Sequence, residues 1–263
     1  MNKKYGVWAA AACTAMVVGL SGCGSSDKDD KGGKTGGNTV EKPAATSGVE
    51  KLSAQQISDK AKAELIKVKS MRMNVTGTDG GQPMKLDLAL DSAGNCRGSM
   101  TSGTAGSFEL VKMGEKVWMK PDDAFWKTQL GPQKGAEGAK LFSGKWLHGS
   151  TSDPQLKDMA EMCNLKAMQA KAAADTDNNH FTKGTPVTQG GQQVIPLNGK
   201  TEKGAPLTLY VAITGKPYPV KIVESGKDAS TTELSDYDKP VSTDTPSDAE
   251  SIDVAKLQQE LGS

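Results

Sequence analysis

Histidine is rare in this chain of 263 residues, in which only His148 and His180 occur. A metal site built from several histidines is therefore excluded. No two cysteines have the Cys-x-x-Cys spacing, which leaves a zinc ribbon or a thioredoxin-type redox centre without support. The 32 Lys and Arg residues balance 31 Asp and Glu residues. Because no excess of positive charge is left to neutralise phosphates, no nucleic-acid partner is expected.

Catalytic motifs are also missing. The chain contains no Gly-x-Ser-x-Gly elbow, no phosphate-binding loop and no dinucleotide-binding fingerprint. Two Asp-rich stretches resemble calcium loops, but Lys31 stands at a ligand position of the first, and His180 replaces the required glycine of the second. We therefore expect no catalytic residue, no metal ligand and no cofactor, and we do not expect an enzyme.

The first 23 residues have the pattern of a lipoprotein signal. Lys3 and Lys4 precede the uncharged stretch Gly6–Leu20, which is too short to cross a bilayer comfortably. The Leu-Ser-Gly-Cys sequence that ends at Cys23 is of the bacterial lipobox type. We expect a signal peptide over residues 1–22 and acyl chains such as palmitate on Cys23. The protein is then extracytoplasmic and anchored by lipid to the outer face of the cell membrane; a plain secretory signal or an uncleaved membrane anchor is the alternative.

Residues 23–50 are expected to be the acylated cysteine and a flexible tether, because they contain almost no large apolar side chains. Residues 51–263 contain no further linker and are expected to form one domain. A capping box at Ser53 predicts a helix over 53–69, and a second helical region is expected over 136–175, with a helix start at Asp153-Pro154. A short helix is expected over Val254–Leu261. Alternating apolar residues predict strands near 71–76, 84–90, 108–110, 117–119, 185–189, 193–197, 207–213, 220–224 and 231–237.

Two cysteines remain for the folded domain. Cys13 leaves with the signal peptide and Cys23 is acylated, so Cys96 and Cys163 are an even pair in an oxidising compartment. A disulfide between them would close a loop of about 67 residues and contribute roughly 4 kcal/mol in the chain-entropy model. Two free buried thiols are the alternative.

Four groups of short segments occur in a fixed order over about residues 53–250: Ser70-Met71-Arg72; Gly114-Glu-Lys-Val-Trp-Met-Lys120 with Phe125-Trp126; Leu209-Tyr-Val211 with Gly215-Lys-Pro-Tyr-Pro-Val220; and Leu234-Ser-Asp-Tyr-Asp-Lys-Pro-Val241. Together with the lipobox and the tether, they resemble the LppX/LprA/LprF/LprG lipoproteins of actinobacteria. That family is similar to the LolA/LolB carriers. The resemblance implies an α+β fold, in which a strongly curved antiparallel sheet forms a half-open barrel with helices packed on its concave side.

The resemblance also implies an apolar cavity between sheet and helices. In the best understood members this cavity holds the acyl chains of lipids or glycolipids. Each buried methylene contributes roughly 0.8 kcal/mol, so a carrier needs no charged motif for affinity. The expected cavity wall is formed by Met84, Leu86, Leu88, Leu90, Leu207, Leu209, Val211 and Ile213. The expected helix plug is formed by Leu156, Met159 and Met168.

Two functions from different classes follow. The first is a membrane-anchored lipoprotein that binds a lipid, glycolipid or other amphiphile and transfers it within the envelope. The second is a tethered protein-interaction or sensor-accessory domain without a ligand cavity, whose barrel is only a scaffold for protein contacts. The methionines on the apolar strand faces either fit variable apolar partners or fill gaps in the core; they are Met71, Met73, Met84, Met100 and Met119. The sequence names no protein partner. An envelope hydrolase would need a deep polar cleft with converging carboxylates.

Overall fold

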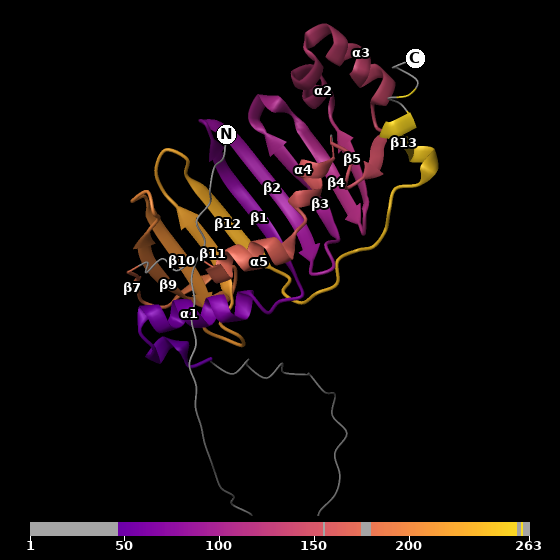
Figure 1. The fold of residues 1–263 in the computed structure, drawn as a ribbon. Coiled ribbons are helices and arrows are strands. Elements are labelled where there is room, and N and C mark those ends of the chain that lie inside the picture. Colours follow the sequence, from indigo (N-terminus) through magenta and orange to yellow (C-terminus); the bar gives the residue numbers. More distant parts are fainter. Residues whose placement is uncertain (1–46, 155, 175–179, 257–258, 260–263) are drawn as a thin grey trace, which may run out of the picture.

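The computed structural model describes residues 47–154, 156–174, 180–256 and 259 (Figure 1). The expected signal peptide over residues 1–22, Cys23 and the tether as far as residue 46 lie outside the described residues. Packing begins earlier than expected, since Ser47 donates its backbone N–H to Ile213 O and Val49 is only 1% exposed. Val49 belongs to the short 3-10 helix η1 (Val49–Lys51). Its apolar side chain joins the core, so residues 47–50 lie against the domain.

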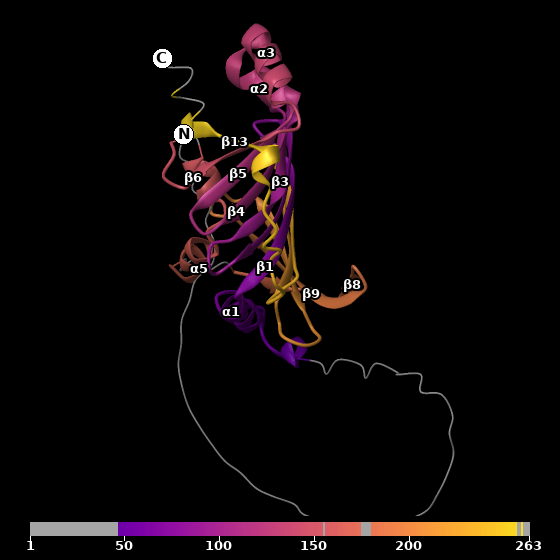
Figure 2. The same cartoon turned by 90° about the vertical axis from the view of Figure 1, so that its right-hand side faces the viewer.

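One sheet of 13 strands forms the body of the molecule. It is curved and unclosed, as Figures 1 and 2 show. The strand order is β13-β6-β5-β4-β3-β2-β1-β12-β11-β10-β9-β7, with β8 paired to β9. The bounds are β1 (Ser70–Asp79), β2 (Gln82–Asp91), β3 (Cys96–Ser102), β4 (Ser107–Met113), β5 (Lys116–Pro121), β6 (Trp146–Ser150), β7 (Thr182–Lys183), β8 (Val187–Gln189), β9 (Gln192–Lys200), β10 (Pro206–Ala212), β11 (Pro219–Glu224), β12 (Ser230–Ser235) and β13 (Ser251–Asp253).

The sheet is mixed rather than purely antiparallel, which corrects one detail of the expected fold. The strand β13 pairs with β6 in parallel, with Ile252 opposite Leu147. After β12 the chain runs back around the sheet and reaches the edge of β6 in the same direction as that strand (Figure 1). A strand of three residues, Ser-Ile-Asp, is too short to carry a period-two pattern.

The helices are α1 (Ala54–Leu65), α2 (Asp123–Leu130), α3 (Pro132–Phe142), α4 (Lys157–Glu161) and α5 (Leu165–Ala174). The predicted capping box is confirmed, because Ser53 Oγ accepts the Gln56 N–H and Gln56 Oε1 accepts the Ser53 N–H. The predicted helix start at Asp153-Pro154 is wrong. The Asp153 carboxylate accepts the Ser150 N–H and closes a turn, and α4 begins only at Lys157. The helix expected over Val254–Leu261 lies partly outside the described residues.

The helices occupy two places. Helices α1, α4 and α5 lie on the concave side of the sheet, whereas α2 and α3 project beyond one end of it (Figures 1 and 2). The larger core cluster joins β2–β6 to the α4–α5 region through residues that include Leu88, Leu90, Leu110, Leu156 and Leu165. The smaller cluster joins α1 to β9 and β10 through Ile57, Ala61, Ile195, Leu197, Leu209 and Val211.

At Gly98 of β3, the backbone of the neighbouring strand β2 leaves no room for a side chain. A Cβ atom built there would lie 1.9 Å from Asp87 O on the neighbouring strand. We expect Gly98→Ala to lower the free energy of unfolding by about 3 kcal/mol, because the backbone of β2 would have to move. Chemical denaturation measures the change. Ser99→Ala, one residue later at an exposed position, is the control and should change stability by less than about 0.5 kcal/mol.

Asp238 fixes the corner after β12. Its carboxylate accepts the Lys69 N–H at 2.7 Å and the Tyr218 hydroxyl at 3.2 Å. The Lys69 hydrogen bond is the largest influence that holds the pKa of Asp238 below its ordinary value. A lowered carboxyl pKa stabilises the fold above the unfolded-state pKa of about 4, and this contribution is lost as the pH falls through the folded-state value.

We therefore expect Asp238→Asn to be less stable than the wild type at pH 7 and to lose less of its stability on acidification below about pH 4. Asparagine tolerates the positive φ of 59° at this position, so the substitution mainly removes charge. Thermal unfolding between neutral and acidic pH measures both effects. Asp228→Asn, at an exposed turn position, is the control; an equal response of the two variants would contradict the prediction.

Candidate ligand-binding face

The register of the sheet places the predicted wall residues on one face. Leu86 of β2 pairs with Val75 of β1, and Val75 pairs with Thr232 of β12. Thr232 pairs with Ile222 of β11, which pairs with Leu209 of β10. Directly paired residues of adjacent strands point to the same side of a sheet. The side chains expected on β2 and on β10 therefore share the face that carries both core clusters, although three strands separate them.

Most of the predicted wall is packed against helices. Leu88 and Leu90 are at most 1% exposed and belong to the larger cluster, whereas Leu209 and Val211 are at most 4% exposed and belong to the smaller one. The predicted wall residues of β2 and those of β10 therefore belong to two different core clusters. The other four predicted wall residues differ in exposure. Leu207 is 5% exposed and Ile213, which follows β10, is 7% exposed, whereas Met84 and Leu86, nearer the start of β2, are only half-buried.

The predicted plug residues lie together on the larger cluster. Leu156 directly precedes α4 and is 1% exposed. Met159 in α4 and Met168 in α5 are partly buried against the same cluster. All three therefore lie in the segment that crosses the concave side (Figure 1).

A second group of apolar side chains on this face is only half-buried. Helices α1 and α5 lie across the ends of the sheet where β1 begins and β2 ends, and no helix lies over the opposite ends of these two strands (Figure 1). We call this part the open concave surface and define it by Met73, Val75, Met84, Leu86, Met100 and Ile222, which are all half-buried. Four of them, Met73, Leu86, Met100 and Ile222, also pack against the larger core cluster. Only Met84 and Leu86 were predicted as wall residues. Met73 and Val75 alternate with polar residues along β1, so their period was visible in the sequence. Met100 lies in a segment without such a pattern, and the part of the sheet that the helices cover was not predictable either.

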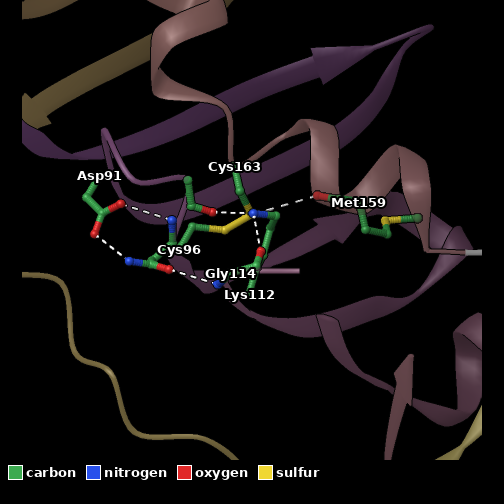
Figure 3. Close-up of a disulfide and its surroundings, with 8 residues drawn as sticks. Asp91, Cys96, Lys112, Gly114, Met159 and Cys163 are labelled. Atoms are coloured by element: carbon green, nitrogen blue, oxygen red, sulfur yellow. Dashed lines mark hydrogen bonds between the residues drawn. A yellow bond between two sulfur atoms is a disulfide. The ribbon is translucent and has the colours of Figure 1, made fainter. Parts of the chain in front are cut away.

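Cys96 of β3 and Cys163, between α4 and α5, form a disulfide with Cα atoms 5.4 Å apart (Figure 3). Both residues are fully buried. The bond ties the segment that covers the larger cluster to the middle of the sheet, which agrees with the pairing expected from the cysteine count.

Lys112 lies beside this disulfide, opposite Cys96 in the β3–β4 ladder. Its ammonium donates hydrogen bonds to Gly94 O at 2.5 Å and to Gly114 O at 2.8 Å (Figure 3). Burial lowers the pKa of the Lys112 ammonium, although the carboxylates of Asp91 and Glu115 oppose this shift. Lys112 therefore serves to join two turns and is not free to face a ligand.

Two hollows in the protein surface lie away from the open concave surface. One, of about 430 Å³, is next to the disulfide and is lined by charged residues that include Lys112, Lys157 and Glu161. The other, of about 640 Å³, is lined by Ser99, Thr101, Glu109 and Lys120, among others. Neither hollow is lined by a predicted wall residue, and both are rich in polar groups.

Gln169 of α5 connects two helices of the concave side. Its amide Nε2 donates to Leu65 O at 3.1 Å and to Val68 O at 2.9 Å, and so satisfies carbonyl groups at the end of α1. We expect Gln169→Ala to lower the free energy of unfolding by about 1–2 kcal/mol, because Val68 O loses the Gln169 amide and Leu65 O keeps only the Val68 N–H, at 3.4 Å. Thermal unfolding measures the loss. Gln133→Ala, at an exposed position of α3, is the control, and equal effects of both variants would argue against this contact.

Within the described residues, no group of three or more His, Cys, Asp or Glu side chains is placed to hold a metal ion. In the same part of the chain, no helix is long and apolar enough to cross a membrane.

No family model and no curated protein sequence matches the chain. Several solved structures do. LprF from Mycobacterium bovis matches with a TM-score of 0.52 at 13% sequence identity, over 74% of this chain and 97% of that one. The lipoprotein LppX from Mycobacterium tuberculosis matches at 0.45 and 12% identity, over 73% and 98% of the two chains. A LolA superfamily protein from Nitrosomonas europaea matches at 0.25 and 12% identity, over 74% and 96%.

These findings confirm the expected resemblance at the level of the fold. The match to LprF spans the same α+β arrangement of a large, curved, unclosed sheet with helices on its concave side. At this level of identity the likeness concerns architecture and not ligands. The chain has the fold of LprF, as its resemblance to the LppX/LprA/LprF/LprG lipoproteins predicted.

Proposed function

We propose that this protein is an extracytoplasmic lipoprotein, anchored through acylated Cys23 to the outer face of the cell membrane. It binds the apolar chains of a lipid, glycolipid or other amphiphile against the concave face of its sheet and transfers them within the envelope. It is a carrier and not an enzyme. The observation that carries this proposal is the open concave surface, a group of six apolar side chains that the domain leaves only half-buried.

The chemistry of that surface suits acyl chains. Its six members are Met, Leu, Val and Ile side chains, and methionine adapts its shape to irregular apolar partners. Burial of apolar area contributes about 25 cal/mol per Å², so a chain laid along several strands gains affinity without any polar contact. The hydroxyl groups of Ser102 and Thr232 lie on the same face, by their pairing with Met84 and Val75, and can bond to the polar part of a ligand.

A specific observation favours the second candidate, a tethered protein-interaction domain. Leu88, Leu90, Leu209 and Val211 are at most 4% exposed, so the middle of the expected wall is filled by the domain's own helices. In that case the open concave surface would be covered by a partner protein. The two candidates therefore differ in what covers the same six side chains.

Native mass spectrometry of residues 24–263, produced without the acyl anchor, separates the candidates. We expect a bound mass that survives purification and that reappears as lipid after organic extraction. A protein that stays free of ligand after incubation with envelope lipids would contradict the carrier function and favour the interaction domain. The extracted lipid would identify the ligand class.

A further inference from the structure

The α2–α3 hairpin, residues Asp123–Phe142, carries the two most exposed large apolar side chains among the described residues. Leu141 is 72% exposed and Leu130 is 46% exposed. The hairpin projects beyond the end of the sheet, away from α1 (Figures 1 and 2). These leucines are therefore held out from the body of the protein.

Helices α2 and α3 pack closely against each other, and this packing fixes the shape of the hairpin. A Cβ atom at Gly135 would lie 2.5 Å from Trp126 O, so the two helices meet through their backbones. A Cβ atom at Gly138 would lie 3.2 Å from Leu130 Cδ1, so the Leu130 side chain rests on that glycine. Residues 134, 138 and 141 follow one line on a helix. Leu130 and Leu141 therefore lie near each other, with Lys134 on the same line.

The charges around the leucines are mixed, with a small positive excess. Within the hairpin, Lys127, Lys134 and Lys140 are exposed, and so are Asp123 and Glu137. Lys145, beyond the hairpin, donates to Ala249 O at 3.0 Å and lies near the Glu250 carboxylate. Asp122 is occupied as the N-cap of α2, where it accepts the Phe125 N–H at 2.7 Å and the Ser107 hydroxyl at 2.6 Å. Exposed leucines among lysines suit the boundary between the headgroups and the acyl chains of an anionic bilayer.

The hairpin stands at the same end of the sheet as the open concave surface. Thr128 of α2 donates its hydroxyl to Thr104 O, at 3.3 Å, in the 3-10 helix η2 (Gly103–Ala105). That helix directly follows β3, whose Ser102 pairs with Met84. A membrane that touched the hairpin would therefore lie close to the uncovered ends of β2 and β3.

The length of chain before the domain permits this contact. The described part begins at Ser47, whose backbone bonds to Ile213, and 23 residues separate it from Cys23. Such a segment can span up to about 75–80 Å. The ten residues of β1 extend over about 33 Å. The hairpin can thus reach the same membrane that holds the acyl anchor.

We propose that the α2–α3 hairpin docks on the surface of an anionic membrane by inserting Leu130 and Leu141 below the headgroups. This inference rests on the proposed function, because docking would place the open concave surface next to the lipid that it takes up or releases. The anchor would then hold the protein near the membrane, and the hairpin would set its orientation.

Vesicle sedimentation tests this proposal with residues 24–263, which retain every described residue and lack the acyl anchor. The probe is a phosphatidylcholine vesicle with about 30% phosphatidylglycerol, whose surface attracts basic groups. We expect the wild type to bind these vesicles, and Leu130→Ser/Leu141→Ser to bind at least about ten-fold more weakly, because two inserted side chains are lost. Lys134→Gln/Lys140→Gln should weaken binding a few-fold at low salt only.

The matched control is Ile66→Ser/Val187→Ser, which changes two large apolar side chains that are 38% and 36% exposed at other sites. It should bind like the wild type, and circular dichroism should show that all variants are folded. Wild-type protein that does not bind, or leucine variants that bind equally well, would overturn the proposal. So would a dimer in light scattering that only the leucine variants lose, because a second copy would then cover the hairpin. Lipid retained in native mass spectrometry by a wild type that does not bind vesicles would leave the proposed function intact and refute only the docking.

Discussion

Replacement of both Cys96 and Cys163 by alanine is expected to lower the free energy of unfolding by about 4 kcal/mol. The bond closes a loop of 67 residues, and its loss releases that entropy in the unfolded chain. Both side chains are fully buried, so two small cavities add to the loss. Chemical denaturation of the variant and of the wild type, with and without reductant, measures the effect.

The effect of reductant and the location of the change distinguish loss of the disulfide from a general loss of stability. Reductant should destabilise the wild type and leave the double variant unchanged, because only the former has a bond to break. Hydrogen exchange should increase most in α4 and α5, which the disulfide ties to β3. A double variant as stable as the wild type would show that the covering helices need no covalent link.

Introduction of carboxylates on the open concave surface is expected to abolish lipid retention. In Leu86→Glu/Met100→Glu, two half-buried apolar side chains on adjacent strands become charged. Acyl chains would then have to desolvate these charges, which costs several kcal/mol, so retained lipid should fall by at least about ten-fold. Native mass spectrometry of the purified variant gives the lipid-bound fraction.

The matched control places the same charges on the opposite face of the sheet. Thr76→Glu/Thr101→Glu changes exposed positions on β1, which pairs with β2, and on β3, where Thr101 directly follows Met100. It should retain lipid like the wild type. Thr101 also lines the 640 Å³ hollow, so a loss of lipid in the control would indicate that the polar hollow is the binding site.

The strands that could be predicted from the sequence are those in which apolar side chains occur at every second position. Leu86, Leu88 and Leu90 alternate with Asp87 and Ala89 along β2. Leu207, Leu209 and Val211 alternate with Thr208 and Tyr210 along β10. The segment Cys96–Ser102 is rich in small and polar residues and becomes β3 because its backbone completes the ladders of β2 and β4. Trp146–Ser150 lay in an expected helical region and becomes β6 for the same reason, with β5 as its partner. Pairing of this kind depends on neighbours that the local sequence does not specify.

The candidate site could be predicted only in part, because the position of the helices over the sheet does not follow from the pattern of any one strand. Alternation assigned Met84, Leu86, Leu207 and Leu209 to apolar faces, and the register places these faces on one side of the sheet. Alternation contains no information on which part of that side the helices cover. Leu209 is buried under α1 and Met84 is only half-buried, because the helices cover one part of the strands and not the other. The open concave surface therefore became visible only in the structure.

Binding of apolar chains to the concave face is tested most directly by photo-crosslinking. Residues 24–263 are crosslinked to a fatty acid that carries a diazirine in its chain, and the labelled peptides are identified by mass spectrometry. We expect adducts on the peptides of β1, β2 and β3 that contain Met73, Val75, Met84, Leu86 and Met100, and we expect these adducts to disappear when unlabelled lipid competes. Adducts confined to the two polar hollows, or labelling that competition does not reduce, would contradict the claim that the concave face binds apolar chains.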